Sequence, residues 1–390
     1  MIASDSTKPN TWRQLLKRHQ GPFLHWLRES GRAQRALQRI AVQLADFLVV
    51  TIDRLRSEWP EAPVEFWNRI PDVRRCCSEV ATFEKPLAVE AYAYVHLLER
   101  YRRTWTTLEY LAKVAVLPLG INGVRVLDIG TGPAPALYAI DDFYAALTNF
   151  AEEFDVSELK LPPPELACVE QSESMVWFFH SFSEFSGRRG PFSPIVADFT
   201  RLDLASRRVW HQRQHEIERY WDQETGQYEE IYEPVTAAAD AERLFRYRLV
   251  VLSNFLTLES EVERFETELR ALFEDLKAGG VVLVLGATGD SYQKLYDRLS
   301  SVARNAGLSR ADWHNDNLGR IERDDEAARV IKETQHRVYR HIEGLVGSSS
   351  LKRGKTWPDY WDPRPSPKAR PRFALRVFRS GRWPNTKSAA

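Results

Sequence analysis

The 390-residue chain is poor in cysteine and has no excess of charge of either sign. Its three cysteines are Cys76, Cys77 and Cys168, and neither their number nor their spacing provides a disulfide framework or a zinc-binding motif. We therefore expect a reducing, cytoplasmic environment. Lysine plus arginine and aspartate plus glutamate both number 54, so the overall charge implies no obligatory polyanionic partner.

Long apolar runs are missing as well. Residues 1–10 lack the apolar segment of a signal peptide. The most apolar early run, 40–52, contains Gln43 and Asp46 and is too short to span a bilayer. We predict no transmembrane segment and interpret this run as the buried face of a helix.

The first part of the chain has a helical pattern, over residues 11–115. Apolar residues recur at helical spacing over 32–56 and over 87–114, where Tyr92, Tyr101 and Trp105 belong to an aromatic stripe. Such stripes are more often protein core than ligand contacts. We predict a helical N-terminal domain over 1–118 and a second domain over 119–390.

From residue 121 the pattern changes to alternating strands and helices, which predicts a parallel α/β sheet. The expected strands are 124–129, 166–170, 195–197, 249–253, 281–285 and 373–378, and the expected helices are 134–150, 174–185, 261–276 and 292–306. Two stretches exceed a minimal fold of this kind, at about 206–241 and 308–372. The first predicts a hairpin around Thr225 and Gly226 or two short helices. Long insertions of this type are often lids or binding surfaces.

The stretch 124–139, VRVLDIGTGPAPALYA, carries the clearest functional signal. A short apolar run that contains Asp128 is followed by Gly130, Thr131 and Gly132, and Pro135 then opens a helical segment. Glycines at a strand-to-helix turn let backbone N–H groups approach a ligand closely. The pattern resembles motif I of the class I S-adenosylmethionine (SAM)-dependent methyltransferases, and the resemblance covers roughly residues 121–308.

The resemblance implies a Rossmann-like class I methyltransferase sheet with SAM as cofactor, bound in part by Asp128, Gly130, Thr131 and Gly132. In that family an acid at the end of the second strand binds the ribose hydroxyl groups. Glu170, followed by Gln171, stands at this place, and a carboxylate suits two hydroxyl donors because it accepts several hydrogen bonds. The alternative is that Glu170 caps the next helix.

Two further strand ends match the family. The resemblance implies that Asp198 accepts a hydrogen bond from the adenine amino group and that Phe199 forms a wall for the ring, although Asp198 equally fits an ordinary strand-end acid. The fourth strand resembles the family's element beside the transferred methyl group, which implies that Ser253, Asn254 and Phe255 lie at its carboxyl end. Ligands of open α/β sheets bind at these carboxyl ends.

The glycine turn departs from the family pattern in its third glycine. Pro133, Ala134 and Pro135 follow Gly132, and the two prolines remove two N–H donors. A dinucleotide site would need a glycine where Pro135 stands and an acid about 20 residues further on. A P-loop would need a Gly-Lys-Ser/Thr sequence after the glycines. The sequence therefore favours SAM over both alternatives.

The acceptor stays open. The family's DNA amino-methyltransferases carry Asn/Asp-Pro-Pro-Phe/Tyr where this chain has Ser253 and Asn254, and no Pro-Cys pair is present for attack on a pyrimidine. The basic, tryptophan-containing segment 351–382 fits RNA phosphates and bases, or a loop that packs on its own domain. His211 and His215 are expected on one helix face, more in keeping with a solvated face than a metal site.

These observations predict a SAM-dependent methyltransferase that acts on RNA or on a small molecule. The alternative is a non-catalytic SAM-binding protein, a degenerate methyltransferase-like partner. We assign no metal site and no catalytic base, because methyl transfer from a sulfonium does not require either.

Overall fold

The computed structural model describes residues 9–75, 80–120, 122–188, 192–196, 199, 202–203, 208–222, 227–239, 247–287, 290–311, 320–321, 325–351 and 373–381. The helices are α1 Pro9–Glu29, α2 Arg32–Glu58, α3 Ala62–Arg75, α4 Val80–Phe83, α5 Ala88–Lys113, α6 Pro135–Glu153, α7 Glu173–Phe185, α8 Glu259–Arg264, α9 Glu266–Glu274, α10 Asp290–Asn305 and α11 Asp325–Val346, with a 3-10 turn at Ser157–Leu159. The strands are β1 Arg125–Ile129, β2 Glu165–Glu170, β3 Phe192–Val196, β4 Leu202–Asp203, β5 Arg208–Asp222, β6 Gln227–Ala239, β7 Leu249–Ser253, β8 Val281–Ala287, β9 Ser309–Arg310, β10 Arg320–Ile321 and β11 Phe373–Arg379.

The central sheet has the strand order β10-β11-β8-β7-β1-β2-β3, with β9 paired to β11. Strands β3, β2, β1, β7 and β8 are parallel, and β11 runs antiparallel to β8. This arrangement confirms the predicted Rossmann-like sheet, and the strand expected at 373–378 is the antiparallel β11. The expected helix 261–276 is two helices, α8 and α9, because Phe265 between them leaves the helical conformation.

Alternate residues of each central strand enter two different cores. Val126 on β1 packs with the N-terminal helices, α6 and α7, whereas Leu127 and Ile129 pack with α8, α9 and α10. Because side chains of a strand alternate between the two faces, both faces of this sheet are covered by helices. The apolar runs in the sequence reflect that double burial.

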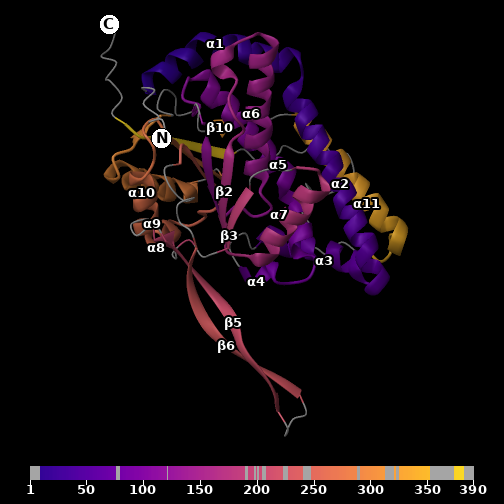
Figure 1. Cartoon of the computed structure of the whole chain (residues 1–390). Coiled ribbons are helices and arrows are strands. Elements are labelled where there is room, and N and C mark those ends of the chain that lie inside the picture. Colours follow the sequence, from indigo (N-terminus) through magenta and orange to yellow (C-terminus); the bar gives the residue numbers. More distant parts are fainter. Residues whose placement is uncertain are drawn as a thin grey trace.

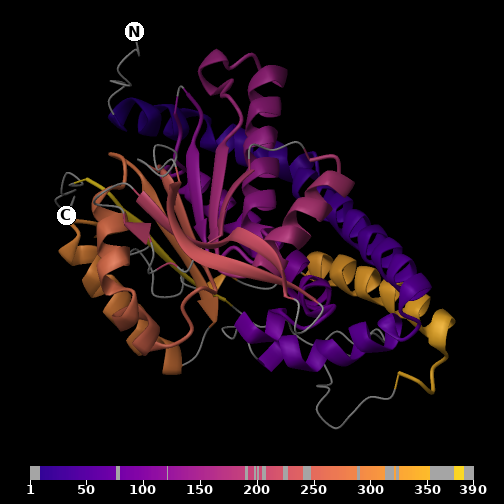
Figure 2. The same cartoon turned by 60° about the horizontal axis from the view of Figure 1, so that its bottom comes forward.

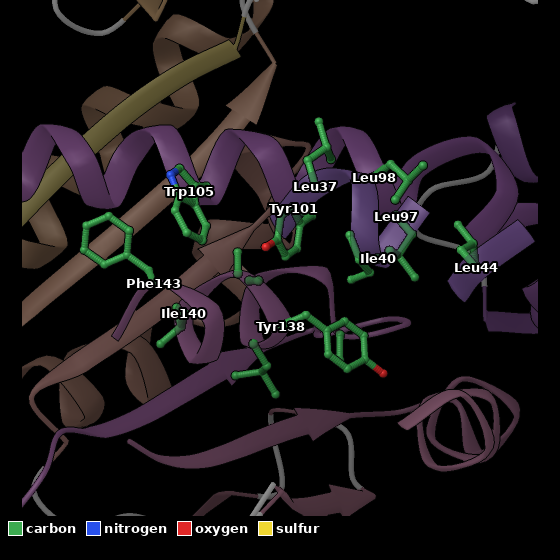
Figure 3. Close-up of a cluster of buried hydrophobic side chains, with 14 of the residues drawn as sticks. Leu37, Ile40, Leu44, Leu97, Leu98, Tyr101, Trp105, Tyr138, Ile140 and Phe143 are labelled. Carbon is green, nitrogen blue, oxygen red and sulfur yellow. The ribbon is translucent and has the colours of Figure 1, made fainter. Parts of the chain in front are cut away.

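The N-terminal helices confirm the predicted helical region 11–115. Helix α5 is buried along most of its length and packs on α1, α2, α3 and α6. Its Tyr101 and Trp105 lie among apolar side chains of α2 and α6, and the Trp105 and Phe143 ring centroids are 5.3 Å apart (Figure 3). At these two positions the aromatic stripe is core, as the periodicity predicts.

Helix α11, inside the late insertion, lies beside the N-terminal helices rather than over the sheet (Figures 1 and 2). It packs on α2, α3 and α5 through residues that include Val330 and Val338. Tyr94 and Gln335 exchange two hydrogen bonds, of 3.0 Å from Tyr94 Oη and 3.2 Å from Gln335 Nε2. A single buried apolar cluster joins these helices to the sheet. The division at residues 118 and 119 stays a prediction.

The first insertion forms a hairpin of β5 and β6 that projects from the body of the protein (Figure 1). This confirms the hairpin alternative. The expectation that His211 and His215 share a helix face is wrong, because both residues lie on strand β5. Their Glu/Gln/Arg-rich surroundings have high helix propensity, and pairing with β6 along the strand overrides it.

Some predictions fall on other parts of the chain. Asp198, the expected hairpin turn at Thr225 and Gly226, and most of the basic segment, 352–372 and 382, lie outside the described residues. Within the described ranges, no helix combines the length and apolar character needed to cross a membrane.

Candidate ligand-binding site

A pocket of about 900 Å³, part of it open to solvent, lies at the carboxyl ends of β1, β2 and β7. From β1 the chain proceeds through β2 to β3 on one side, while β7 and β8 extend the sheet on the other side. The pocket thus stands at the switch point of the sheet, where open α/β folds bind their ligands. Helix α5 contributes Tyr92 and Arg100 to the pocket lining.

The glycine turn after β1 has a backbone conformation that requires small residues. Gly130 has φ +64°, and a Cβ placed on it would lie 2.6 Å from Cδ2 of Phe255. Gly132 has φ +56° and lines the pocket. Ala134, which replaces the family's third glycine, keeps the left-handed conformation with φ 60°. Pro135 is then the first residue of α6, where a missing N–H costs nothing.

The backbone N–H groups of the turn are used inside the protein. Gly130 donates to the Val169 carbonyl oxygen at 2.8 Å, and Thr131 reaches the same oxygen at 3.4 Å. Gly132 donates to Glu170 Oε2 at 2.7 Å, and Ala134 donates to the Thr131 carbonyl. Every N–H between residues 130 and 134 therefore has an acceptor. The turn admits a ligand closely, but it does not present the free N–H donors that the sequence pattern suggests.

Glu170 joins β2 to the glycine turn. Its Oε2 accepts from Gly132, and its Oε1 accepts from the Ser172 N–H at 3.0 Å. The helix cap is Ser172, whose hydroxyl accepts from Met175, so Glu170 is not the capping residue of α7. Burial raises the pKa of Glu170, and the bonds from Ser172 and Gly132 oppose that rise. A carboxylate accepts about four hydrogen bonds, so Glu170 retains capacity for ligand hydroxyl groups in the pocket.

Asp128 and Thr131 lie behind the turn and do not line the pocket. Asp128 is 1% exposed, its Oδ2 accepts from the Thr131 hydroxyl at 2.5 Å, and its Oδ1 is buried without a hydrogen-bond partner. Burial raises the pKa of Asp128 to about 7, against the lowering effect of the Thr131 hydrogen bond. These two residues hold the turn in shape. Ser253, also predicted, is buried below the pocket floor and does not line it.

Three other residues expected to bind the cofactor, Gln171, Asn254 and Phe199, line the pocket. Phe199 meets two further aromatic residues of the pocket lining: Phe255, expected at the end of the fourth strand, and Phe265, which the sequence did not indicate. The three ring centroids lie 5.1–5.6 Å apart, which forms a continuous aromatic wall. Among the described side chains, no group of three or more His, Cys, Asp or Glu is placed to hold a metal ion.

Tyr92 and Arg100 are the other residues that sequence reasoning missed. Tyr92 was grouped with the core stripe, yet its Cε1 would lie 3.6 Å from a Cβ on Gly132. Arg100 follows it by two turns on the same face of α5 and is 8% exposed. The sequence contains no distinct signal for Arg100, because polar residues such as His96 and Thr104 lie at helical spacing on either side of it.

No protein-family model and no curated protein matches the chain. Solved structures with a similar arrangement include several SAM-dependent methyltransferases. The central sheet, with its parallel strands and antiparallel β11, has the Rossmann-like arrangement that the resemblance to class I SAM-dependent methyltransferases implies.

One similar structure is the magnesium protoporphyrin IX methyltransferase of Synechocystis PCC 6803 with bound SAM, at 10% identity, covering 74% of this chain and 85% of that one, with a TM-score of 0.34. A second is a SAM-dependent methyltransferase of Clostridium acetobutylicum, at 8% identity, covering 72% and 92%, also at 0.34. A third is the [4+2]-cyclase SpnF, at 16% identity, covering 71% and 80%, at 0.34. At such identities the likeness concerns the fold and does not extend to the reaction.

Proposed function

We propose that the chain binds SAM in this pocket and transfers its methyl group to an acceptor. The observation that carries the proposal is the contact between Glu170 and Gly132. It places the carboxylate at the end of β2 directly against the glycine turn, at the switch point of the sheet and facing the pocket. The assignment of Ser172 as the N-cap of α7 supports this role of Glu170 over that of a helix cap.

The residues present fit this cofactor. The pocket volume falls within the usual range for sites of small molecules and cofactors. Gly130 lies so close to Phe255 that a side chain at this position would overlap the ring, so this part of the turn stays without one. Glu170 offers acceptors for the ribose hydroxyls, and Phe199 belongs to an aromatic wall suited to a flat base.

SAM, when bound, supplies the activated methyl group and the leaving group. The protein then has to orient the two reactants and exclude water. Phe83, Tyr92 and Met175 add apolar surface to the pocket lining, and Asn254 follows β7, where the resemblance places the methyl group. We assign no catalytic base.

The acceptor is RNA or a small molecule. RNA would be bound through the basic segment 351–382, and a small aromatic acceptor would be covered by the insertion 206–241. RNA binding that weakens steeply with salt supports the first class, and salt-independent turnover of a small acceptor supports the second. A cytoplasmic location is part of the same proposal and rests on the scarcity of cysteine.

The test is calorimetric titration of the full-length protein with SAM and, separately, with NADH. We expect saturable SAM binding and no response to NADH. Glu170→Ala should weaken SAM binding by about 1–3 kcal/mol, the cost of removing a charged hydrogen-bond partner. The matched control is Glu165→Ala, at the opposite, exposed end of β2, which should leave the affinity unchanged.

Absence of SAM binding by the wild-type protein would reject the proposal. SAM binding without turnover on RNA or small-molecule acceptors would support the alternative, a non-catalytic SAM-binding partner protein. An unchanged affinity in the Glu170 variant would show that the carboxylate serves the glycine turn alone.

A further inference from the structure

Arg100 is a buried cation in the wall of the pocket that neither the fold nor the glycine turn explains. It stands on α5, is 8% exposed and lines the pocket. Its Nη1 donates to the Tyr92 hydroxyl, and its guanidinium carbon lies 4.9 Å from the Tyr92 ring centroid. Tyr92 thus holds the guanidinium against the pocket wall.

No carboxylate forms an ion pair with Arg100 among the residues that the structure describes. Asp128 interacts with it electrostatically, but that side chain is enclosed behind the glycine turn and bonds to Thr131. Burial of a guanidinium without a paired anion is costly. The pocket is therefore the place from which an anionic partner reaches Arg100.

The glycine turn strengthens this argument. Its N–H groups between Gly130 and Ala134 all have acceptors within the protein, and Pro133 has no N–H. The turn thus offers no uncommitted donor to an anionic ligand group. Arginine has five N–H donors in a planar fork that matches a carboxylate, and Tyr92 accepts from only one nitrogen of Arg100.

We propose that Arg100 binds the α-carboxylate of the amino-acid half of the cofactor, with Tyr92 as its positioning residue. This inference rests on the proposed function and extends it: the helical layer that precedes the sheet supplies the donor that the glycine turn lacks. In this proposal Glu170 binds the ribose hydroxyl groups of the cofactor, and Arg100 binds its carboxylate.

The experiment compares two ligands that differ in the carboxylate-bearing part. S-adenosylhomocysteine carries the amino acid, and 5′-methylthioadenosine lacks it. Arg100→Met keeps the length and apolar stem of the side chain and removes its charge. We expect this variant to bind S-adenosylhomocysteine about 10- to 150-fold more weakly and 5′-methylthioadenosine unchanged, because a lost charged hydrogen bond has that effect.

Two further variants make the comparison specific. Arg100→Lys keeps the charge without the fork, and it should recover part of the S-adenosylhomocysteine affinity. Arg103→Met is the matched control, because Arg103 lies on the same helix, pairs with Glu99 and packs over Phe373 outside the pocket. It should leave the ratio of the two affinities as in the wild type.

Equal weakening of both ligands in Arg100→Met would overturn the proposal and make Arg100 a structural residue. If the wild-type protein binds S-adenosylhomocysteine and Arg100→Met binds both ligands as tightly as the wild type does, this inference is overturned and the proposed function stands. Wild-type protein that binds neither ligand would overturn both.

Discussion

Gly130 and Gly132 adopt the same backbone conformation in different surroundings, which allows conformational strain and steric overlap to be measured separately. Both have φ near +60°, where alanine is disfavoured. A Cβ on Gly130 would lie 2.6 Å from Phe255 Cδ2, a separation that real Cβ atoms do not show. A Cβ on Gly132 would meet Tyr92 at 3.6 Å, an ordinary contact.

The magnitudes follow from these two terms. Left-handed backbone costs a non-glycine residue roughly 1–2 kcal/mol, so Gly132→Ala should lower the free energy of unfolding by about that much. Overpacking adds about 1–3 kcal/mol, because the Phe255 ring is held between Phe199 and Phe265 and cannot move freely. Gly130→Ala should therefore cost roughly 2–5 kcal/mol.

The assay is urea unfolding of both variants at one pH, followed by titration with S-adenosylhomocysteine. In the Gly130→Ala background, Phe255→Ala should lower the free energy of unfolding by less than it does in the wild type, because it removes the overlap between the new Cβ and the ring. Equal destabilisation by the two glycine variants, or full additivity with Phe255→Ala, would refute the packing of Phe255 on the turn. Gly130→Val should abolish binding of the cofactor, and retained affinity would mean that the site is elsewhere.

Three further predictions concern buried polar groups and the same turn. Ala134→Gly should raise the urea midpoint by the equivalent of about 1 kcal/mol, since it relieves a left-handed alanine, and a lower midpoint would contradict this. The pKa of Asp128, about 7 against 3.8 normally, means that the folded state binds its proton more tightly. Ionisation of Asp128 therefore lowers the free energy of unfolding increasingly from about pH 4 to pH 7. Over that interval Asp128→Asn should become more stable relative to the wild type. Parallel pH dependences of the free energy of unfolding in the two proteins would contradict this. Asp142→Ala should lower the free energy of unfolding in urea by about 3–5 kcal/mol, because it leaves buried Arg188 without this carboxylate. Asp141 is more exposed, so Asp141→Ala should lower it much less.

The sheet was predictable because its signals are local. Strand β7 has the predicted bounds, and β1 and β2 differ from them by one residue each. Each is a short apolar run bounded by glycine or polar residues, and burial on both faces removes the alternation that would otherwise be needed to recognise it. Because the ends of these strands could be located, the candidate site residues that follow them could be predicted as well.

Helix α11, by contrast, was not predicted from the sequence. Its apolar residues Ala327, Val330, Ile331 and Val338 are spaced as on one helical face, so the sequence did contain the signal. What the sequence could not show is where that face packs, since its partners on α2 and α5 lie more than 200 residues earlier in the chain.

The pocket residues divide in the same way. Gly130, Gly132 and Glu170 were identified because the chemistry of a strand-end turn fixes their types. Tyr92 and Arg100 were not identified, because their place in the site depends on how α5 crosses the sheet. The aromatic stripe on α5 is core along one part of the helix and pocket wall along another, and helical periodicity does not distinguish the two.

Helix α5 therefore connects the stability of the protein to its site. Tyr101 on this helix donates to Asp142 of α6 at 2.7 Å, and Arg188 after α7 binds the same carboxylate at 2.8 Å. The residue directly before Tyr101, Arg100, lines the pocket. Since the buried network fixes α5 to the helices that flank β1 and β2, the guanidinium is held in place before any ligand arrives. A donor on a preorganised helix loses little freedom on binding, which makes the helical layer a working part of the site rather than a cover over it.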